Sequence, residues 1–210
     1  MSKQANFDRI APFYDLLAGV VFGNKLELAQ RHFLSHLESP GELLILGGGT
    51  GNILEPLVSR YPEARIDFLE TSENMMALAN ARFSPAKYNI NYVNRTEEHL
   101  QRCSISYDVI ITPFVLDVFE PIHLNKIVQQ LMGCLKNGGI WVNTDFHQSQ
   151  RPWWGRYLIR VMYSFFKVTT GMKNQQLPDF ENIFGNLPLV EIEQKSFFYG
   201  IIRTVMYKKT

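Results

Sequence analysis

The residues in this sequence that point most clearly to chemistry are four glycines within five positions. The apolar run 43–46 leads directly into these glycines, which are Gly47, Gly48, Gly49 and Gly51. Glycine costs conformational entropy to order, so such a cluster needs a structural reason. A strand that ends in a glycine turn and leads into a helix lets a ligand approach the backbone, and the helix amino terminus offers N–H donors. The pattern therefore predicts a site for an anionic or nucleoside-bearing cofactor.

The spacing of the glycines distinguishes this site from two other phosphate-binding loops. A dinucleotide fingerprint requires G-x-G-x-x-G, but counting from either Gly47 or Gly49 puts another residue at the sixth place. A phosphate loop of the type G-x-x-x-x-G-K-[ST] requires a lysine, and no lysine follows the glycines here. Glu70 stands 19 residues beyond Gly51, at the end of the next predicted strand. A carboxylate at that place can accept hydrogen bonds from ribose hydroxyls.

The glycine run, in the form G-x-G-x-G after an apolar strand, resembles the first motif of the class I S-adenosylmethionine-dependent methyltransferases. FLETSENMMALA (68–79) resembles the acidic-x-Ser-x-x-Met element of that family. YDVIITPFVLDVF (107–119) and LKNGGIWVNTDF (135–146) resemble its fourth-strand and fifth-strand motifs. The resemblance covers nearly the whole chain in the right order. It implies a Rossmann-like α/β fold and S-adenosyl-L-methionine as the cofactor.

The same resemblance assigns residues to the cofactor. It implies that Glu70 holds the ribose and that Met75 lies near the adenine. The family often places an acidic residue after the third strand to receive the adenine amino group; here Thr96 stands there with Glu97 beside it, and either could serve. The full set of predicted cofactor-binding residues is Tyr14, Gly47, Gly48, Gly49, Gly51, Glu70, Thr71, Met75, Thr96, Glu97 and Thr112.

One position departs from the family pattern. Two places before the first glycine the family usually carries an acidic residue, which helps to organise the amino-acid end of the cofactor, and Ile45 stands there instead. This departure leaves open a protein that binds the cofactor or a partner without catalysing transfer. A nicotinamide oxidoreductase is a further alternative, but the failed G-x-G-x-x-G spacing argues against it.

The two ends of the chain bear on the methyl acceptor. FDRIAPFYDLLAGVVFG (7–23) resembles the entry segment of the ubiquinone/menaquinone C-methyltransferases, in which a Tyr-Asp pair, here Tyr14-Asp15, lies near the cofactor; a packed aromatic is the alternative. FFYGIIRTVMYKK (197–209) resembles the closing hairpin of that subfamily. After the fourth strand, however, Asp117-Val118 replaces the usual Arg-Asn pair. We therefore predict a small apolar or amphipathic acceptor that is quinone-, phenol- or lipid-like.

Nucleic acid is a poor fit as the acceptor. Formal net charge is +1, no basic cluster is present, and TPFV (112–115) replaces the Asn-Pro-Pro-Tyr-like signature of base methylation. A protein acceptor remains an alternative.

An aromatic segment, 147–174, separates the fifth strand from the hairpin. As a helix it would carry an apolar stripe, with Arg156, Arg160 and Lys167 on the other face. Three interpretations remain open: a helix packed on the core, a substrate lid, or peripheral membrane contact through 153–168.

Methyl transfer from a sulfonium is an in-line displacement, in which the protein aligns the reactants and excludes water. A carbon or oxygen nucleophile would also need a base. The candidate catalytic residues are Asp117, just after the fourth strand, and His147, just after the fifth. The remaining histidines and the two cysteines lack the grouping of metal ligands, so the sequence predicts no metal site.

Alternating short apolar strands and helical stretches must position these residues. The predicted strands are 43–46, 64–70, 90–93, 107–112 and 139–146, and the predicted helices are 24–38, 52–60, 72–82 and 123–135. The last of these helices ends in the glycine C-cap Asn137-Gly138-Gly139, and 189–198 and 200–209 form consecutive strands. We predict a mostly parallel seven-stranded sheet with helices on both faces and a C-terminal antiparallel β-hairpin. One domain would cover 1–210, with a cap segment at 1–40 and a lid insertion at 147–187.

Composition sets the remaining limits. The 210 residues are 46% hydrophobic and 20% charged, a globular profile. The first residues lack the pattern of a signal peptide, and no apolar run reaches the roughly 18 residues that span a bilayer. Cys103 and Cys134 lie far apart, as expected for reduced thiols. These features favour a cytoplasmic protein and leave its oligomeric state open.

Overall fold

The structure is a computed structural model that describes residues 8, 19–94, 100–101, 106–147, 153–171 and 176–210. Its strands are β1 (Glu42–Leu46), β2 (Arg65–Leu69), β3 (Ile90–Val93), β4 (Tyr107–Pro113), β5 (Leu135–Phe146), β6 (Leu189–Phe197) and β7 (Ile202–Lys209). Its helices are α2 (Lys25–Arg31), α3 (Leu54–Arg60), α4 (Glu73–Arg82), α6 (Pro121–Cys134), α7 (Trp153–Thr170) and α8 (Phe180–Gly185), with 3₁₀ turns η1 (Leu34–His36) and η2 (Leu116–Val118).

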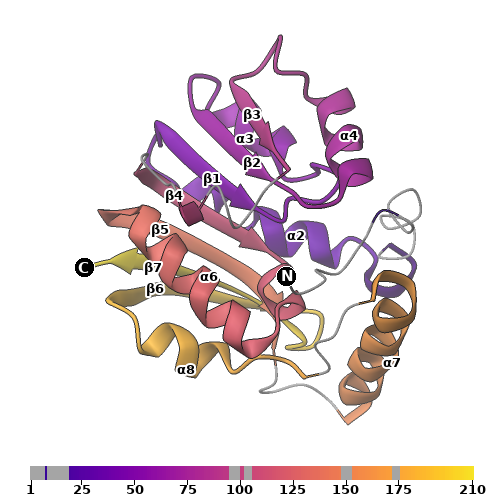
Figure 1. Cartoon of the computed structure of the whole chain (residues 1–210). Helices are drawn as coiled ribbons and strands as arrows, with labels where there is room; N and C mark the ends of the chain where they lie inside the picture. Colours follow the sequence, from indigo (N-terminus) through magenta and orange to yellow (C-terminus); the bar gives the residue numbers. More distant parts are fainter. Residues whose placement is uncertain (1–7, 9–18, 95–99, 102–105, 148–152, 172–175) are drawn as a thin grey trace.

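The strands form one seven-stranded sheet in the order β3-β2-β1-β4-β5-β7-β6 (Figure 1). Neighbours among β1 to β5 pair in parallel, whereas β7 pairs antiparallel with both β5 and β6. The predicted fold class is therefore confirmed. The sequence did not predict that the second strand of the hairpin, β7, would lie inside the sheet while β6 takes the edge.

Helices cover both faces of this sheet, which explains why its central strands are continuous apolar runs. In β1, Leu44 and Leu46 belong to the core shared with α6 and α8. Leu43 and Ile45 point to the other face, where η1, α3 and α4 pack. A third apolar cluster joins α7 to the carboxyl end of β5 and the amino end of β7 through Ile159, Phe146 and Ile202, among others.

Two predicted helix boundaries were wrong. The helix predicted over 24–38 ends at Arg31, and η1 follows. The Tyr61 hydroxyl lies 2.8 Å from the Leu34 carbonyl oxygen and 2.7 Å from that of Leu37, so these carbonyls bond to a side chain instead of to a continuing helix.

The predicted glycine C-cap was also wrong. Helix α6 ends at Cys134 and β5 begins at the next residue. The Lys209 ammonium donates to the carbonyl oxygens of Met132 and Leu135, each at 2.7 Å, and so satisfies the end of the helix with a cation. Gly138, with φ +75°, lies instead where the register between β4 and β5 shifts.

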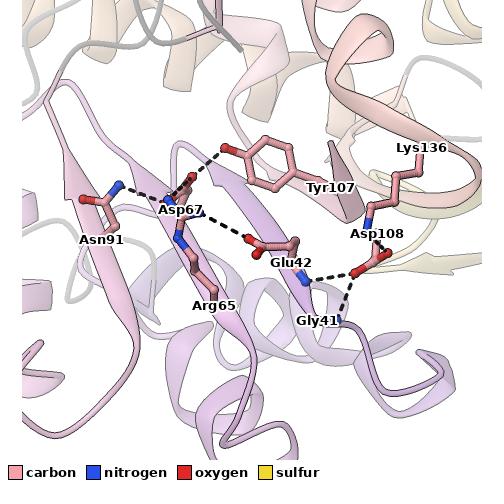
Figure 2. Close-up of polar contacts among 8 residues, drawn as sticks. All are labelled: Gly41, Glu42, Arg65, Asp67, Asn91, Tyr107, Asp108 and Lys136. Atoms are coloured by element: carbon pink, nitrogen blue, oxygen red, sulfur yellow. Dashed lines mark hydrogen bonds and ion pairs between the residues drawn. The ribbon is translucent and has the colours of Figure 1, made fainter. Parts of the chain in front are cut away.

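The two edges of the parallel strands differ in character. At the amino-terminal edge, Figure 2 shows a polar network in which the Asp67 carboxylate accepts hydrogen bonds from Arg65, Asn91 and Tyr107. In the same network Asp108 accepts from the backbone N–H groups of Gly41 and Glu42 and from the Lys136 ammonium. The carboxyl-terminal edge carries the glycine turn and is the edge at which α/β sheets bind ligands.

Helix α7 lies at the side of the molecule, outside the two helical layers (Figure 1). Within the described residues, no helix has both the length and the apolar character needed to cross a membrane. Helix α8, which falls within the predicted lid insertion 147–187, packs Phe180 and Phe184 into the main core beside Trp141. A lid function for this insertion therefore remains a prediction that concerns α7 above all.

Candidate active site

The glycine turn joins β1 to α3 at the carboxyl-terminal edge. Gly47, Gly49 and Gly51 have φ angles of +72°, +59° and +83°, which favour glycine strongly. A Cβ atom at Gly47 would overlap Val115, one at Gly48 would overlap Phe68, and one at Gly51 would lie 2.8 Å from the Ala79 Cβ. A Cβ at Gly49 would meet nothing closer than the Met75 sulfur, at 4.0 Å. Three of the glycines thus allow close packing. The backbone of Gly49 is open, because no atom fills the space that a Cβ would occupy there.

Glu70 lies directly against this open backbone. One carboxylate oxygen accepts the Gly49 N–H at 3.0 Å, and the other accepts the Ser72 N–H at 2.9 Å. The side chain is buried, and burial raises the pKa of the Glu70 carboxyl above its usual range, although the backbone donors oppose the shift. Glu70, selected by its spacing from the glycines, therefore lies on the glycine turn, and ribose binding by Glu70 stays a prediction.

The next element, α4, begins beside Glu70 because Ser72 caps it. The Ser72 hydroxyl oxygen accepts the Met75 N–H at 3.2 Å and donates to the Asp8 carboxylate at 2.7 Å. Asp8 also accepts the Asn74 N–H at 3.2 Å, so Asp8 lies at the start of α4. On the other side, the Asn94 amide donates to the carbonyl oxygens of Glu70 and Thr71. Asp8 and Asn94 were not predicted.

These residues fit the nucleoside of S-adenosylmethionine. The Glu70 carboxylate has further acceptor positions beyond the two that bind backbone N–H groups, as ribose hydroxyls require. Met75 is buried next to Gly49, and its contact with the adenine stays a prediction. Position 45 contributes no charge, because its residue is an isoleucine. The Ile45 side chain is fully buried in the apolar core.

Other predicted cofactor contacts are placed less directly. The Thr112 hydroxyl is buried within the sheet, where it donates to the Asn143 amide oxygen at 2.8 Å and accepts from the Trp141 indole at 3.0 Å. This bonding indicates a structural role, and cofactor contact by Thr112 stays a prediction. Tyr14, Thr96 and Glu97 lie outside the described residues.

Two buried carboxyl groups meet where β4 and β5 end. The Asp145 carboxylate accepts the backbone N–H of Asp117 at 3.3 Å and that of Phe146 at 2.8 Å. The Tyr163 hydroxyl, from α7, donates to the Asp117 carboxylate at 2.9 Å. Burial raises the pKa of Asp117 to about 6. Burial and then the charge of Asp117 raise the pKa of Asp145 well above its usual range.

The pair can therefore hold and release a proton near neutral pH. Sequence reasoning selected Asp117 but missed Asp145 and Tyr163. The available signal was Asp145 near the end of the predicted strand 139–146, together with Asp117 shortly after the preceding predicted strand 107–112.

His147, the other candidate catalytic residue, belongs to a separate group. Its Nε2 lies 3.1 Å from an Arg203 guanidinium nitrogen, and the same nitrogen donates to Glu181 at 2.7 Å. Asp145, His147 and Arg203 help to line a cavity of about 10 Å³ between β5, β7 and α8, which holds at most about one water molecule. The structure thus brings Asp117 together with Asp145, and brings His147 together with Arg203.

Comparison with known proteins agrees with this geometry. A family profile described as "Methyltransferase domain" matches residues 43–139, which contain the glycine turn and Glu70. A ubiquinone/menaquinone biosynthesis C-methyltransferase of Syntrophotalea carbinolica is 30% identical over 149 residues, which cover 70% of this chain. The chain belongs to the class I S-adenosylmethionine-dependent methyltransferases.

Two further similarities cover almost all of this methyltransferase. A demethylmenaquinone methyltransferase of Chlamydia caviae is 23% identical over 94% of the chain. The solved structure of the mitomycin 7-O-methyltransferase MmcR matches 98% of the chain with a TM-score of 0.71 and 14% identity. The chain spans 62% of the length of the Syntrophotalea relative, 91% of the Chlamydia relative and 61% of MmcR. At this low identity, the structural match supports the fold alone.

Proposed function

We propose that this methyltransferase transfers the methyl group of S-adenosylmethionine to a small apolar or amphipathic acceptor that is quinone-, phenol- or lipid-like. The observation that carries the proposal is the arrangement of the carboxyl-terminal edge. There Glu70 binds the open glycine turn, and the buried Asp117–Asp145 pair follows on the next strands beneath α7.

The roles of the residues follow from their positions. Bound S-adenosylmethionine supplies a methyl group activated by a positively charged sulfur. The backbone at Gly49 and the Glu70 carboxylate orient the nucleoside. Asp117, supported by Asp145, takes the proton that an acceptor hydroxyl or carbon acid loses as the new bond forms. Helix α7 covers this edge through Ile159 and Tyr163 and excludes water from it. His147 remains a second candidate base.

The apolar acceptor is supported by two observations. Both relatives carry names that refer to menaquinone. The elements around the carboxyl end of β5 and the amino end of β7 also carry many aromatic side chains, including Phe114, Phe146 and Trp154. Asp117-Val118 in place of the subfamily's Arg-Asn pair argues for an acceptor that differs from the quinones of those relatives. The proposal includes peripheral membrane contact through 153–168, since an acceptor of this kind dissolves in lipid.

A binding protein without turnover is the second candidate function, because Ile45 leaves the amino-acid end of the cofactor without its usual acidic partner. In that case S-adenosylmethionine would bind but no acceptor would be methylated.

Calorimetric titration with S-adenosylmethionine, and with NAD in parallel, tests the cofactor site. We expect binding of the former only, weakened about 10- to 100-fold in Glu70→Ala, because a buried charged acceptor is lost. Gly49→Val should abolish it by filling the open backbone position. Glu73→Ala is the matched control, since Glu73 lies exposed in the first turn of α4.

Transfer is then assayed with a panel of reduced quinones, phenols and lipids and labelled cofactor. Methylation of any member supports the proposal. Binding of the cofactor without transfer to any of them supports the binding-protein alternative. Equal affinity in Glu70→Ala and the parent would contradict the assignment of the site.

A further inference from the structure

Helix α7 has apolar side chains on both of its faces. Ile159 and Tyr163 are buried against the rest of the protein, as is Gly155. The opposite face, here called the outward face, also carries large apolar residues that are exposed to solvent: Trp153 (85%), Tyr157 (71%), Val161 (48%), Phe165 (39%) and Val168 (83%). Their spacing of three or four residues places them in one row along the helix. Such a row marks an interaction surface, because soluble proteins rarely leave large contiguous apolar patches exposed.

The charges beside this row all have one sign. Arg156, Arg160 and Lys167 are exposed and follow the same spacing, so they flank the apolar row on one side. Helix α7 contains no aspartate or glutamate. Within the described residues, none of these cations is part of an ion pair. The outward face is therefore complementary to an anionic surface that also accepts aromatic side chains.

The turn between β6 and β7 extends this patch. The Tyr199 ring packs edge-on against Trp154 at a centroid distance of 5.6 Å, and Tyr199 is itself exposed. On its inward side the helix reaches the Asp117–Asp145 pair through the Tyr163 hydroxyl. A surface bound to the outward face would thus lie one helix diameter, about 10 Å, from the proposed acceptor site.

We propose that the outward face of α7, together with Tyr199, docks this protein onto the surface of an anionic lipid bilayer. Trp153, Tyr157 and Val168 enter the headgroup region, while the cations bind lipid phosphates. This inference rests on the proposed function, which supplies the apolar acceptor. It deepens that function, because docking explains how such an acceptor reaches the site from lipid.

A second copy of the chain is a weaker occupant of the same face. Two-fold pairing would bring the same face of each copy together. Arg156, Arg160 and Lys167 of one copy would then face their counterparts, with no acidic residue on either helix to neutralise them.

Vesicle co-sedimentation tests the docking. The probes are vesicles of phosphatidylcholine alone and of phosphatidylcholine mixed with an equal part of phosphatidylglycerol. We expect binding to the mixed vesicles only, weakened by salt and accompanied by a blue shift of tryptophan fluorescence. Loss of two cations in Arg156→Gln/Arg160→Gln should weaken binding roughly 30-fold. Trp153→Ser/Val168→Ser should weaken it by a similar or larger factor.

Ile122→Ser is the matched control, because Ile122 is equally exposed (84%) but lies on α6. It should bind vesicles like the parent protein. No binding to anionic vesicles at low salt, or equal binding by all variants, would overturn the proposal. A dimer in light scattering that becomes monomeric in Trp153→Ser/Val168→Ser would overturn it in favour of self-association.

Calorimetry with S-adenosylmethionine on the same variants separates the two proposals. Retained cofactor affinity with lost vesicle binding shows that each variant is folded and that α7 is the docking surface. Vesicle binding without any cofactor binding would leave the docking proposal standing and remove the proposed function.

Discussion

Asp117 is the single residue whose surroundings bear most directly on both stability and catalysis. Burial raises its pKa from 3.8 to about 6, so the folded protein binds a proton more tightly than the unfolded chain. The ionised Asp117 carboxylate therefore destabilises the fold. The free energy of unfolding falls as pH rises from about 4 through 6, where the folded group ionises. Asp145, whose pKa is raised in the same direction, adds to this loss.

Asp117→Asn should therefore stabilise the protein above pH 6. The amide cannot ionise, and its oxygen can still accept the Tyr163 hydroxyl. We expect a gain on the order of 1–3 kcal/mol at pH 8 that shrinks toward pH 4. Thermal unfolding at both pH values measures this difference. A variant that is less stable than the parent at pH 8 would show that the carboxylate is a favourable partner in the fold.

The same variant should lose methyl transfer while it keeps its affinity for S-adenosylmethionine. If Asp117 takes the proton of the acceptor, the parent rate falls below about pH 6, as the carboxylate becomes protonated, and Asp117→Asn is slow at all pH values. Rates across this range on the best acceptor of the panel provide the measurement. A parental rate and pH profile in the variant would transfer the role to His147 or to no residue.

Single residues could be predicted where spacing along one segment carried the signal. Glu70 was found because its distance from the glycines is fixed by one βαβ unit, and the structure places it on Gly49. Asp145 and Tyr163 were missed because they meet Asp117 from 28 and 46 residues away, so no local pattern joins them. Asp8 was missed for the same reason, since it reaches Ser72 across 64 residues.

At the scale of elements, two glycines of the turn have different roles. Gly51 packs against α4, whereas Gly49 leaves space beside Glu70. An alanine at either Gly49 or Gly51 must adopt a left-handed conformation, which costs about 1–2 kcal/mol. At Gly51 the added Cβ would also lie 2.8 Å from the Ala79 Cβ, so α4 must shift, at a further cost of about 1–3 kcal/mol.

We therefore expect Gly51→Ala to lower the free energy of unfolding more than Gly49→Ala does. Gly49→Ala should instead lower affinity for S-adenosylmethionine at least tenfold, because its Cβ enters open space beside Glu70. Urea denaturation and calorimetry on both variants measure the two effects. Equal destabilisation, or unchanged affinity in Gly49→Ala, would contradict this division of roles.

Element types followed from hydrophobic periodicity, whereas some element ends did not. The wrong C-cap at Asn137-Gly138-Gly139 had a tertiary cause, because Lys209 from the last strand satisfies the end of α6. The shortened α2 had a similar cause in the Tyr61 hydroxyl, which bonds to carbonyls that a longer helix would use. In both cases a side chain from a distant part of the sequence replaced the local signal.

At the scale of the whole molecule, the sheet separates stability from function. The amino-terminal edge carries the buried Asp67 network (Figure 2). The carboxyl-terminal edge carries the glycine turn and the Asp117–Asp145 pair. The sequence predicted the fold class but could not place β7 between β5 and β6, because antiparallel pairing is possible on either side of a hairpin strand. That placement matters for the site, since it brings Arg203 next to His147.

This separation predicts that Tyr107→Phe affects folding alone. The Tyr107 hydroxyl donates to the fully buried Asp67 carboxylate at 2.6 Å, so its loss weakens the solvation of a buried charge and should cost about 1–3 kcal/mol of unfolding free energy. Because β4 runs seven residues, about 20 Å, from Tyr107 to its carboxyl end, affinity for S-adenosylmethionine should stay within about twofold of the parent.

Tyr92→Phe is the matched control, because its half-buried hydroxyl donates to the neutral Phe83 carbonyl and should cost only about 0.5–1.5 kcal/mol. Urea denaturation ranks the two variants, and calorimetry measures the cofactor. If Tyr107→Phe weakened cofactor binding as strongly as it weakened the fold, the two edges of the sheet would be coupled. The glycine turn would then depend on the far ends of its strands, through the parallel pairing of β1 with β2 and β4 that connects them.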